Sequence, residues 1–194
     1  MAHPKAGKPN AGAPVKLLAA VLAGRDFDLE RLLFPMLEER FGRIDHRGAA
    51  HPFDGTDYYE DEMGPSLGRL VISFEPLCEA TDIVQVKLDT AAIEEDLSGE
   101  GGRRVNIDPG YMDYYKIILA SFKEGPQKIY LGRGVYADPI LLFFEGEYGP
   151  LPWTFPDFKS GVYREDFREI RALYKKARRE ESQKSGGLPI DAAP

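Results

Sequence analysis

The apolar segment Val15–Ala23 constrains the fold of this chain more than any other feature of the sequence. Apolar residues fill almost all of it, and its length is typical of a buried β-strand and too short to span a bilayer. Lysines precede the segment, as they do in a signal peptide, but prolines interrupt this leader. We therefore predict an internal β-strand in a cytoplasmic protein that has no membrane partner.

A helix is predicted after this strand, because apolar residues recur at helical spacing over Leu29–Phe41. Asp26 or Asp28 is placed to cap the start of this helix, and Gly42 is placed to end it. Pro35 lies inside the segment, so it is expected to bend the helix or to remove one of its hydrogen bonds.

Further strand-like runs follow along the chain, and helical spacing returns near its end. Strands are predicted at Leu70–Phe74, Ile83–Leu88, Lys116–Phe122, Ile129–Leu131, Val135–Ala137 and Ile140–Phe144, and helices at Thr90–Leu97 and Tyr163–Ala177. Gly132–Gly134 suits a tight hairpin turn, and Pro139 marks a bulge or an edge. This number of strands excludes a helical bundle. The sequence therefore predicts an α+β (or α/β) fold, in which a mixed β-sheet packs against two or three helices.

The domain organisation follows from length and local composition. The chain has 194 residues, which fit one core, and no linker or repeat interrupts residues 14–182, which are predicted to form a single domain. Residues 1–13 are rich in Pro, Gly, Ala and Lys and are predicted to be a disordered leader. Residues 183–194 are predicted to be a disordered tail.

Charge and cysteine content exclude several kinds of function. The formal net charge of −7 argues against a dedicated nucleic-acid-binding protein, because neutralising phosphates requires a basic face. A local basic patch that holds one small anion stays compatible with this charge. Cys78 is the only cysteine, so neither a disulfide within the chain nor a cysteine-rich zinc site can form.

The segment Arg103–Tyr111 is the strongest candidate for a ligand-binding site. It combines Arg103 and Arg104, whose guanidinium groups suit phosphate or carboxylate, with Asn106, Asp108 and Tyr111. Strand-like alternation would place Asn106 and Asp108 on one face. Asp108 begins an Asp-Pro-Gly sequence that is typical of a turn. It is a candidate general base, a metal ligand or only the first residue of that turn.

Carboxylates elsewhere in the chain are candidate Mg²⁺ ligands, because this ion prefers oxygen donors. We assign Asp54, Asp57 and Asp138 to this group, with Asp57 also a candidate catalytic residue. The alternative for Asp54 and Asp57 is a turn followed by a helix cap. Arg133, at the tip of the predicted hairpin, is a further candidate anion ligand.

Well-defined nucleotide-binding and metal-binding motifs are absent from the sequence. The sequence contains no G-x-x-x-x-G-K-[ST] phosphate loop, no strand-linked G-x-G-x-x-G and no H-E-x-x-H. The Pro-rich segment Leu151–Phe158 carries Trp153 and Phe155, which favours either a loop packed over the core or an apolar contact surface.

Taken in order, these segments resemble the uncharacterised bacterial family known as domain of unknown function 4416 over nearly all of Val15–Tyr174. The matching stretches are Val15–Leu22, Glu39–Gly42, Pro52–Asp54, Thr56–Tyr59, Glu62–Gly64, Lys87–Leu88 with Thr90, Arg103–Tyr111, Ile129–Ala137 and Leu151–Phe158. Some members of this family are labelled GTP-binding proteins, so the resemblance implies a nucleotide as a candidate ligand. Because the known nucleotide motifs are absent, such a ligand would be held by Arg103, Arg104, Lys123 and Arg133.

Three functional hypotheses follow from the sequence, which leaves the oligomeric state open. The first is a domain that binds an anionic small molecule, such as the nucleotide GTP. The second is a Mg²⁺-dependent enzyme that uses the carboxylates named above. The third is a protein-interaction module whose partner surface includes Trp153, Phe155 and the C-terminal helix.

Overall fold

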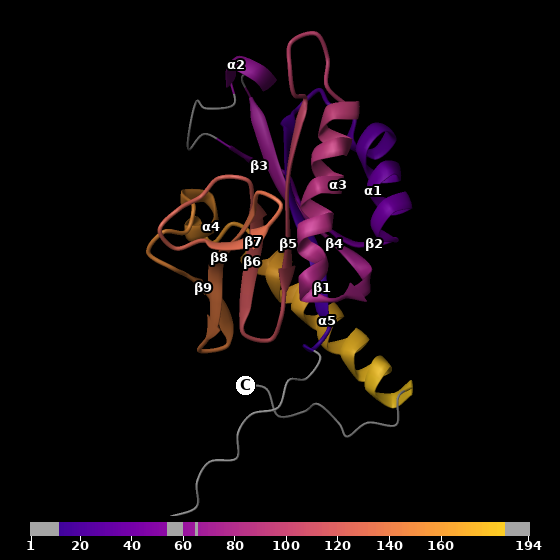
Figure 1. Ribbon diagram of the computed structural model, residues 1–194, viewed down its shortest axis with the longest axis vertical. Coiled ribbons are helices and arrows are strands. Elements are labelled where there is room, and N and C mark those ends of the chain that lie inside the picture. The colour runs from indigo at the N-terminus through magenta and orange to yellow at the C-terminus, as the bar shows by residue number, and fades with distance from the viewer. Residues whose placement is uncertain (1–11, 54–59, 65, 185–194) are drawn as a thin grey trace, which may run out of the picture.

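The computed structural model describes residues 12–53, 60–64 and 66–184, which form one nine-stranded sheet and the helices around it (Figure 1). The strands are β1 (Val15–Gly24), β2 (Ile44–Arg47), β3 (His51–Pro52), β4 (Leu67–Cys78), β5 (Val105–Met112), β6 (Lys116–Ser121), β7 (Ile129–Gly132), β8 (Val135–Phe144) and β9 (Glu147–Pro150). The helices are α1 (Phe34–Phe41), α2 (Glu60–Met63), α3 (Ile83–Asp96), α4 (Pro156–Ser160) and α5 (Arg164–Lys184), with a π-turn at Leu29–Leu33 and a 3₁₀-turn at Ala80–Asp82.

The strand order is β2-β4-β1-β5-β6-β8-β7, while β3 also pairs with β4 and β9 with β8. This arrangement confirms the predicted α+β fold. The sheet is not mixed, because the strand pairs of the described residues are all antiparallel. Hairpins connect β5 to β6, β7 to β8 and β8 to β9, and a hairpin can only join antiparallel neighbours.

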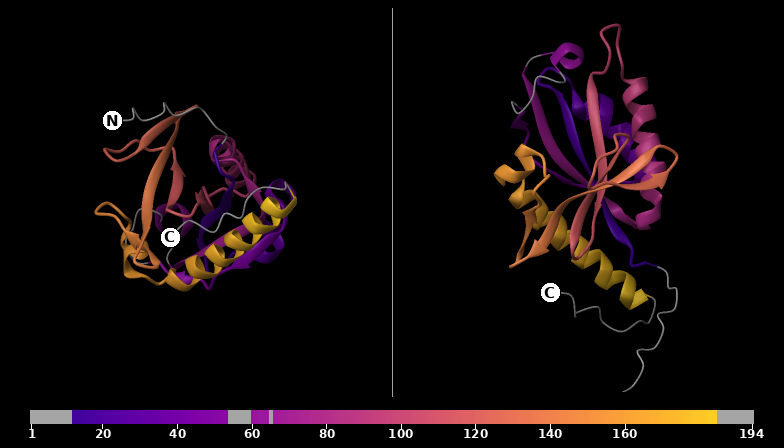
Figure 2. Two further views of the ribbon diagram at one scale, coloured as in Figure 1. Left: turned by 90° about the horizontal axis from the view of Figure 1, so that it is seen from below. Right: turned by 60° about the vertical axis from the view of Figure 1, so that its left-hand side comes forward.

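Strand β1 confirms the prediction for Val15–Ala23 and lies at the centre of the protein. Its side chains are buried on both faces of the sheet. Leu17 and Val21 belong to a core that includes residues of α1 and α3, whereas Leu18 and Ala20 belong to a second core that α5 covers. Figures 1 and 2 show these helices on opposite faces of the sheet. Burial on both faces explains why β1, apart from Lys16, is apolar instead of alternating.

The first helix contains the irregularity that Pro35 predicts. A π-turn occupies Leu29–Leu33, and the regular helix α1 begins only at Phe34, so Pro35 falls in its first turn, where no backbone donor is required. Asp28 caps the π-turn by accepting a hydrogen bond from the Arg31 backbone, and Gly42 follows α1 with a φ of 90°. The predicted cap and stop are both confirmed.

The predicted strand at Ile83–Leu88 is wrong, because this segment is the first half of helix α3. Glu79 and Asp82 form a reciprocal capping box that starts the helical backbone just before it. The helix predicted to begin at Thr90 therefore begins about two turns earlier. Thr90 lies inside α3, and its hydroxyl donates to the Lys87 carbonyl oxygen. The alternating valines that suggest a strand also fit a helix whose buried positions include Ile83, Val86 and Ile93.

The predicted turn at Asp108–Gly110 is also wrong, because all three residues lie within strand β5. Pro109 is tolerated there because β5 pairs only with β1 before Gly110, where β6 joins. At Gly110 an added Cβ would lie 2.3 Å from the Ile118 carbonyl oxygen. Only glycine therefore permits β6 to approach β5 at this point.

The hairpin and the bulge predicted for the second half of the sheet are both confirmed. Arg133 and Gly134 occupy the turn between β7 and β8 with φ values of 54° and 78°. Opposite Pro139 the register between β6 and β8 shifts at Ile117 and Ile118, which places a bulge there. The left view of Figure 2 shows the orange strands of this half standing at an angle to the strands around β1.

The predicted leader and tail mostly lie outside the described residues. At the C-terminal end α5 continues through Lys184, so residues 183 and 184 are helical and do not belong to a tail. None of the described helices combines the length and the apolar character needed to cross a lipid bilayer.

Candidate functional site

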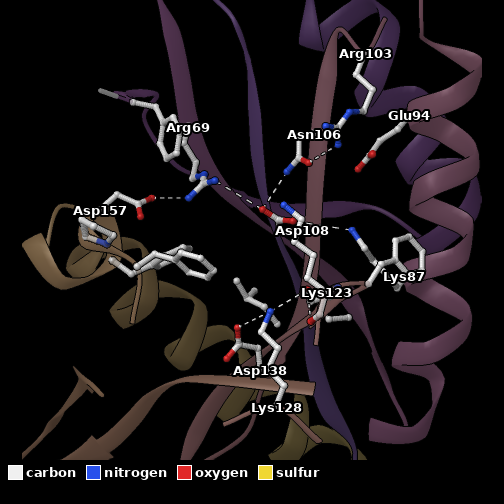
Figure 3. A pocket seen from close by; sticks show the side chains of 18 residues that line it. Arg69, Lys87, Glu94, Arg103, Asn106, Asp108, Lys123, Lys128, Asp138 and Asp157 are labelled. Carbon is white, nitrogen blue, oxygen red and sulfur yellow. Dashed lines mark hydrogen bonds and ion pairs between the residues drawn. The ribbon is translucent and has the colours of Figure 1, made fainter. Parts of the chain in front are cut away.

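A cavity of about 480 Å³ lies where β6 separates from β5 (Figure 3). Its lining consists of aromatic and charged side chains contributed by β4, α3, β5, β6, β8, α4 and the connections beside them. These residues are Phe53, Arg69, Lys87, Glu94, Arg103, Asn106, Asp108, Leu119, Ala120, Ser121, Phe122, Lys123, Lys128, Asp138, Phe155, Pro156, Asp157 and Phe158. A cavity of this size is within the range of small-molecule sites in proteins.

Helix α3 closes the edge of β5 that β6 leaves unpaired. Lys87 Nζ donates a hydrogen bond of 2.9 Å to the Ile107 carbonyl oxygen, and Glu94 Oε1 accepts one of 2.6 Å from the Ile107 backbone N–H. Lys87 and Glu94 share one face of α3, since they lie about two helical turns apart. Their side chains take the place of a neighbouring strand, so the sheet can open without leaving the Ile107 backbone unsatisfied.

Arg69, on β4, is the most enclosed cation of the cavity, with a side chain only 5% exposed. It donates a hydrogen bond of 2.7 Å to Asp157 Oδ2 and lies 3.7 Å from Asp108 Oδ2. Its guanidinium carbon is 4.2 Å from the centre of the Phe53 ring, a cation–π distance. Arg69 Nε and Asp157 Oδ1 are buried and have no hydrogen-bond partner among the described residues.

Asp108 projects into the cavity from β5, and its side chain is 29% exposed. Its Oδ2 accepts a hydrogen bond of 3.0 Å from Asn106 Nδ2, which confirms that these two side chains share a face of the strand. Its Oδ1 lies 4.0 Å from Lys87 Nζ, beyond hydrogen-bonding distance. Asp108 therefore stands between two cations and presents one oxygen that is not hydrogen-bonded within the described part of the chain.

Lys128 and Asp138 form the opposite wall of the cavity (Figure 3). Lys128 Nζ lies 3.3 Å from Asp138 Oδ2 and donates a hydrogen bond of 3.0 Å to Ser121 Oγ. Gln127 Nε2 donates to Asp138 Oδ1, so both oxygens of this buried carboxylate have partners. Within the described ranges, no group of three or more acidic, histidine or cysteine side chains is arranged to hold a metal ion.

Burial also changes the acid–base behaviour of the cavity wall. Desolvation raises the pKa of the Glu94 carboxyl above its ordinary value, against the opposing effects of Lys87 and of the hydrogen bond from Ile107. A raised pKa favours the neutral form of Glu94.

The structure brings together some of the candidate residues and separates others. Arg103, Asn106, Asp108 and Asp138 line the cavity, as does Lys123. The remaining candidates lie elsewhere: Arg104 packs over the Phe27 ring, Tyr111 packs against the core of α1 and α3, and Arg133 donates to Gln85. Asp54 and Asp57 lie outside the described residues.

Five charged residues of the cavity are not identified from the sequence: Arg69, Lys87, Glu94, Lys128 and Asp157. For Arg69 a signal exists, because it is an isolated charge inside the apolar strand β4. The spacing of Lys87 and Glu94 becomes informative only once their segment is known to be helical. Lys128 lies in the connection between β6 and β7, and Asp157 lies in the first turn of the short helix α4. Charged residues are common in both places, so the sequence carries no signal for them.

One short sequence pattern has the spacing of a serine nucleophile motif but not its structural context. Gly64-Pro65-Ser66-Leu67-Gly68 matches G-x-S-x-G, and Ser66 has a φ of 70°. In a nucleophile elbow the serine follows a strand and precedes a helix, whereas Ser66 leads into β4. No described histidine is hydrogen-bonded to Ser66, so the described residues do not have the arrangement of a nucleophile elbow.

Comparison with known proteins identifies the family but no activity. No curated protein and no solved structure matches this chain. The model of a family described as a domain of unknown function, DUF4416, matches residues 13–174, which include every residue that lines the cavity. The chain therefore belongs to the DUF4416 family.

Proposed function

We propose that the cavity between β5 and β6 binds an anionic small molecule. One observation carries this proposal: Arg69, Lys87 and Lys128 reach the cavity from different elements with side chains only 5%, 7% and 10% exposed. Removing cations from water is costly unless negative charge compensates them. Asp157 and Asp138 already pair with Arg69 and Lys128. The carboxylate that faces Lys87, that of Asp108, is 4.0 Å away, so a bound anion would add to this compensation.

The charge balance of the cavity supports an anionic ligand over a cationic one. Its described lining contains five cationic and four acidic side chains, in a chain whose net charge is −7. A small anion is thus favoured locally, while the overall charge of the protein disfavours a nucleic-acid polymer.

A nucleotide such as GTP is a specific version of this proposal. Four phenylalanine rings line the cavity, namely Phe53, Phe122, Phe155 and Phe158, and they offer apolar surface to a base or another planar group. We place this binding activity in the cytoplasm, without a membrane partner, as the composition of the chain predicts.

Isothermal titration calorimetry tests the proposal with inorganic phosphate, GTP and ATP, each with and without Mg²⁺. Lys128→Met should weaken the binding of an anion about 10- to 100-fold, the range expected for one charge-assisted hydrogen bond. Lys116→Met is the matched control, because Lys116 pairs with Asp113 outside the cavity, and it should leave affinity unchanged.

The titrations with phosphate, with nucleotides and with Mg²⁺ test different parts of the proposal. If millimolar concentrations of these anions all fail to bind, the proposal is wrong. If phosphate binds and the nucleotides do not, only the nucleotide version is wrong. A requirement for Mg²⁺ would favour the carboxylate-dependent enzyme over simple binding.

A further inference from the structure

We propose that the anionic ligand also carries a hydroxyl group, which donates a hydrogen bond to Asp108 Oδ1. This inference rests on the proposed anion site and narrows its ligand to a hydroxylated phosphate ester or hydroxy acid. It assigns to Asp108 the role of a binding residue that selects for a hydroxyl.

The geometry of Asp108 leaves one acceptor position open to the cavity. Its Oδ2 accepts a hydrogen bond of 3.0 Å from Asn106 Nδ2, whereas Oδ1 accepts none from the described residues and lies 4.0 Å from Lys87 Nζ. A partly exposed carboxylate that lines a cavity with an unused oxygen is an acceptor for a ligand donor.

The surroundings of Asp108 favour a neutral donor over a charged one. Arg69 at 3.7 Å and Lys87 at 4.0 Å already balance the single negative charge of this carboxylate. An ammonium group on the ligand would be a third cation in the same place, and like charges repel at such distances. A hydroxyl donates its hydrogen bond without adding charge.

A chain of polar contacts fixes the orientation of the Asp108 carboxylate. Glu62, on α2, pairs with Arg103 at 2.7 Å. Arg103 donates to Asn106 Oδ1 at 3.3 Å, and this bond turns the Asn106 amide so that its Nδ2 faces Asp108. The acceptor is therefore held in place before a ligand arrives, which lowers the entropic cost of binding.

Two further cations of the cavity, Lys128 and Lys123, can bind the acidic group of the ligand at a distance from the hydroxyl position at Asp108. Figure 3 shows Lys128 on the opposite side of the cavity from Asn106 and Arg103, with Asp108 between them. Lys123 lines the same cavity beside Ser121. A ligand with its acidic group toward Lys128 and a hydroxyl toward Asp108 would span the cavity.

Two probes of equal chain length test this inference: glycerol 3-phosphate and n-propyl phosphate. Both carry the same phosphate group, but only glycerol 3-phosphate carries hydroxyl groups. The apolar lining of the cavity favours the propyl chain, so tighter binding of glycerol 3-phosphate would show that its hydroxyl groups contribute to affinity. We expect the protein to bind glycerol 3-phosphate about 10- to 100-fold more tightly, as for one hydrogen bond to a charged group.

In the variant Asp108→Asn, the affinities for glycerol 3-phosphate and n-propyl phosphate should become about equal. Its affinity for n-propyl phosphate should stay the same or increase, because a negative charge has left the anion site. Asp89→Asn, on the part of α3 outside the cavity, is the control and should keep the full preference.

The outcomes separate the two proposals. If neither ester binds the unmodified protein, the proposed anion site fails. If both bind with equal affinity, or if Asp108→Asn keeps the preference, the hydroxyl assignment fails while the anion site stands. The comparison of the two esters with the unmodified protein is decisive even if the variant does not fold.

Discussion

The buried ion pair between Lys16 and Asp45 yields the sharpest prediction about stability. Lys16 lies on β1 with a side chain only 1% exposed, and its ammonium group contacts the Asp45 carboxylate of β2. Ser73, on β4, donates a hydrogen bond of 2.7 Å to the other oxygen of Asp45. The perturbation that we consider is Lys16→Met, which keeps the length of the side chain and removes its charge.

The expected cost follows from what this change leaves behind. Asp45 would remain buried with Ser73 as its hydrogen-bond donor but without its cation, and breaking a buried pair in this way costs about 3–5 kcal/mol. For a domain of this size such a loss lowers Tm by roughly 6–20 °C. Burial lowers the pKa of Lys16 despite the opposing effects of Asp45, so desolvation outweighs attraction at this residue. The double variant Lys16→Met with Asp45→Asn should therefore recover most of the lost stability.

Urea denaturation followed by circular dichroism measures these changes. The midpoint should fall for Lys16→Met while the m value, which reports the surface exposed on unfolding, stays constant. Lys176→Met, on the exposed face of α5, should change stability by less than about 0.5 kcal/mol and serves as the control.

Two results would refute this reasoning. A cost below about 1 kcal/mol for Lys16→Met would mean that Asp45 finds another partner or water. A double variant that is less stable than Lys16→Met alone would mean that the pair is not the source of the loss.

Three further predictions concern other residues. Burial raises the pKa of Glu94, so between pH 4.5 and the raised pKa the folded state binds a proton that the unfolded state does not. The free energy of unfolding should therefore fall as pH rises through this window. Urea denaturation at several pH values measures this slope, and Glu94→Gln should remove it. Gly110→Ala should destabilise the protein by about 1–3 kcal/mol, because the added Cβ would contact the Ile118 carbonyl oxygen. Gly101→Ala, whose Cβ would have no neighbour within 4 Å, is the control and should be nearly neutral. A similar cost for both variants would exclude the close approach of β6 as the cause. Burial raises the pKa of Cys78 to about 11, so at pH 8 a thiol-specific reagent should modify the folded protein at least roughly 100-fold more slowly than the denatured chain, and equal rates would contradict this burial.

Much of the fold is predictable because local signals and tertiary packing agree. Val15–Ala23 is apolar on both faces, and the protein buries both faces of β1. The turn at Arg133 and Gly134 requires positive φ values, which the glycines of this segment favour and therefore predict. The prediction at Ile83–Leu88 fails because a strand and a helix can share the same short apolar pattern, and the capping box at Glu79 and Asp82 decides between them.

The candidate site is only partly predictable, because its residues come from distant segments. The alternation in Arg103–Tyr111 correctly places Asn106 and Asp108 together. It cannot indicate that Arg69 and Asp157, which are far away in the sequence, would meet Asp108 across a cavity. Arg104 and Arg133 have suitable chemistry, but the fold directs them to Phe27 and Gln85.

The sequence by itself therefore determined the fold class, the central strand and the part of the cavity wall that β5 contributes, because each depends on the order of residues along one segment. The tertiary structure alone decided that β6 leaves β5 after a short pairing at Gly110–Met112 and that α3 covers the edge exposed by this separation. The physical reason is that the opening requires two conditions from distant segments. A glycine must let β6 cross close to β5, and Lys87 with Glu94 must satisfy the Ile107 backbone in place of a strand.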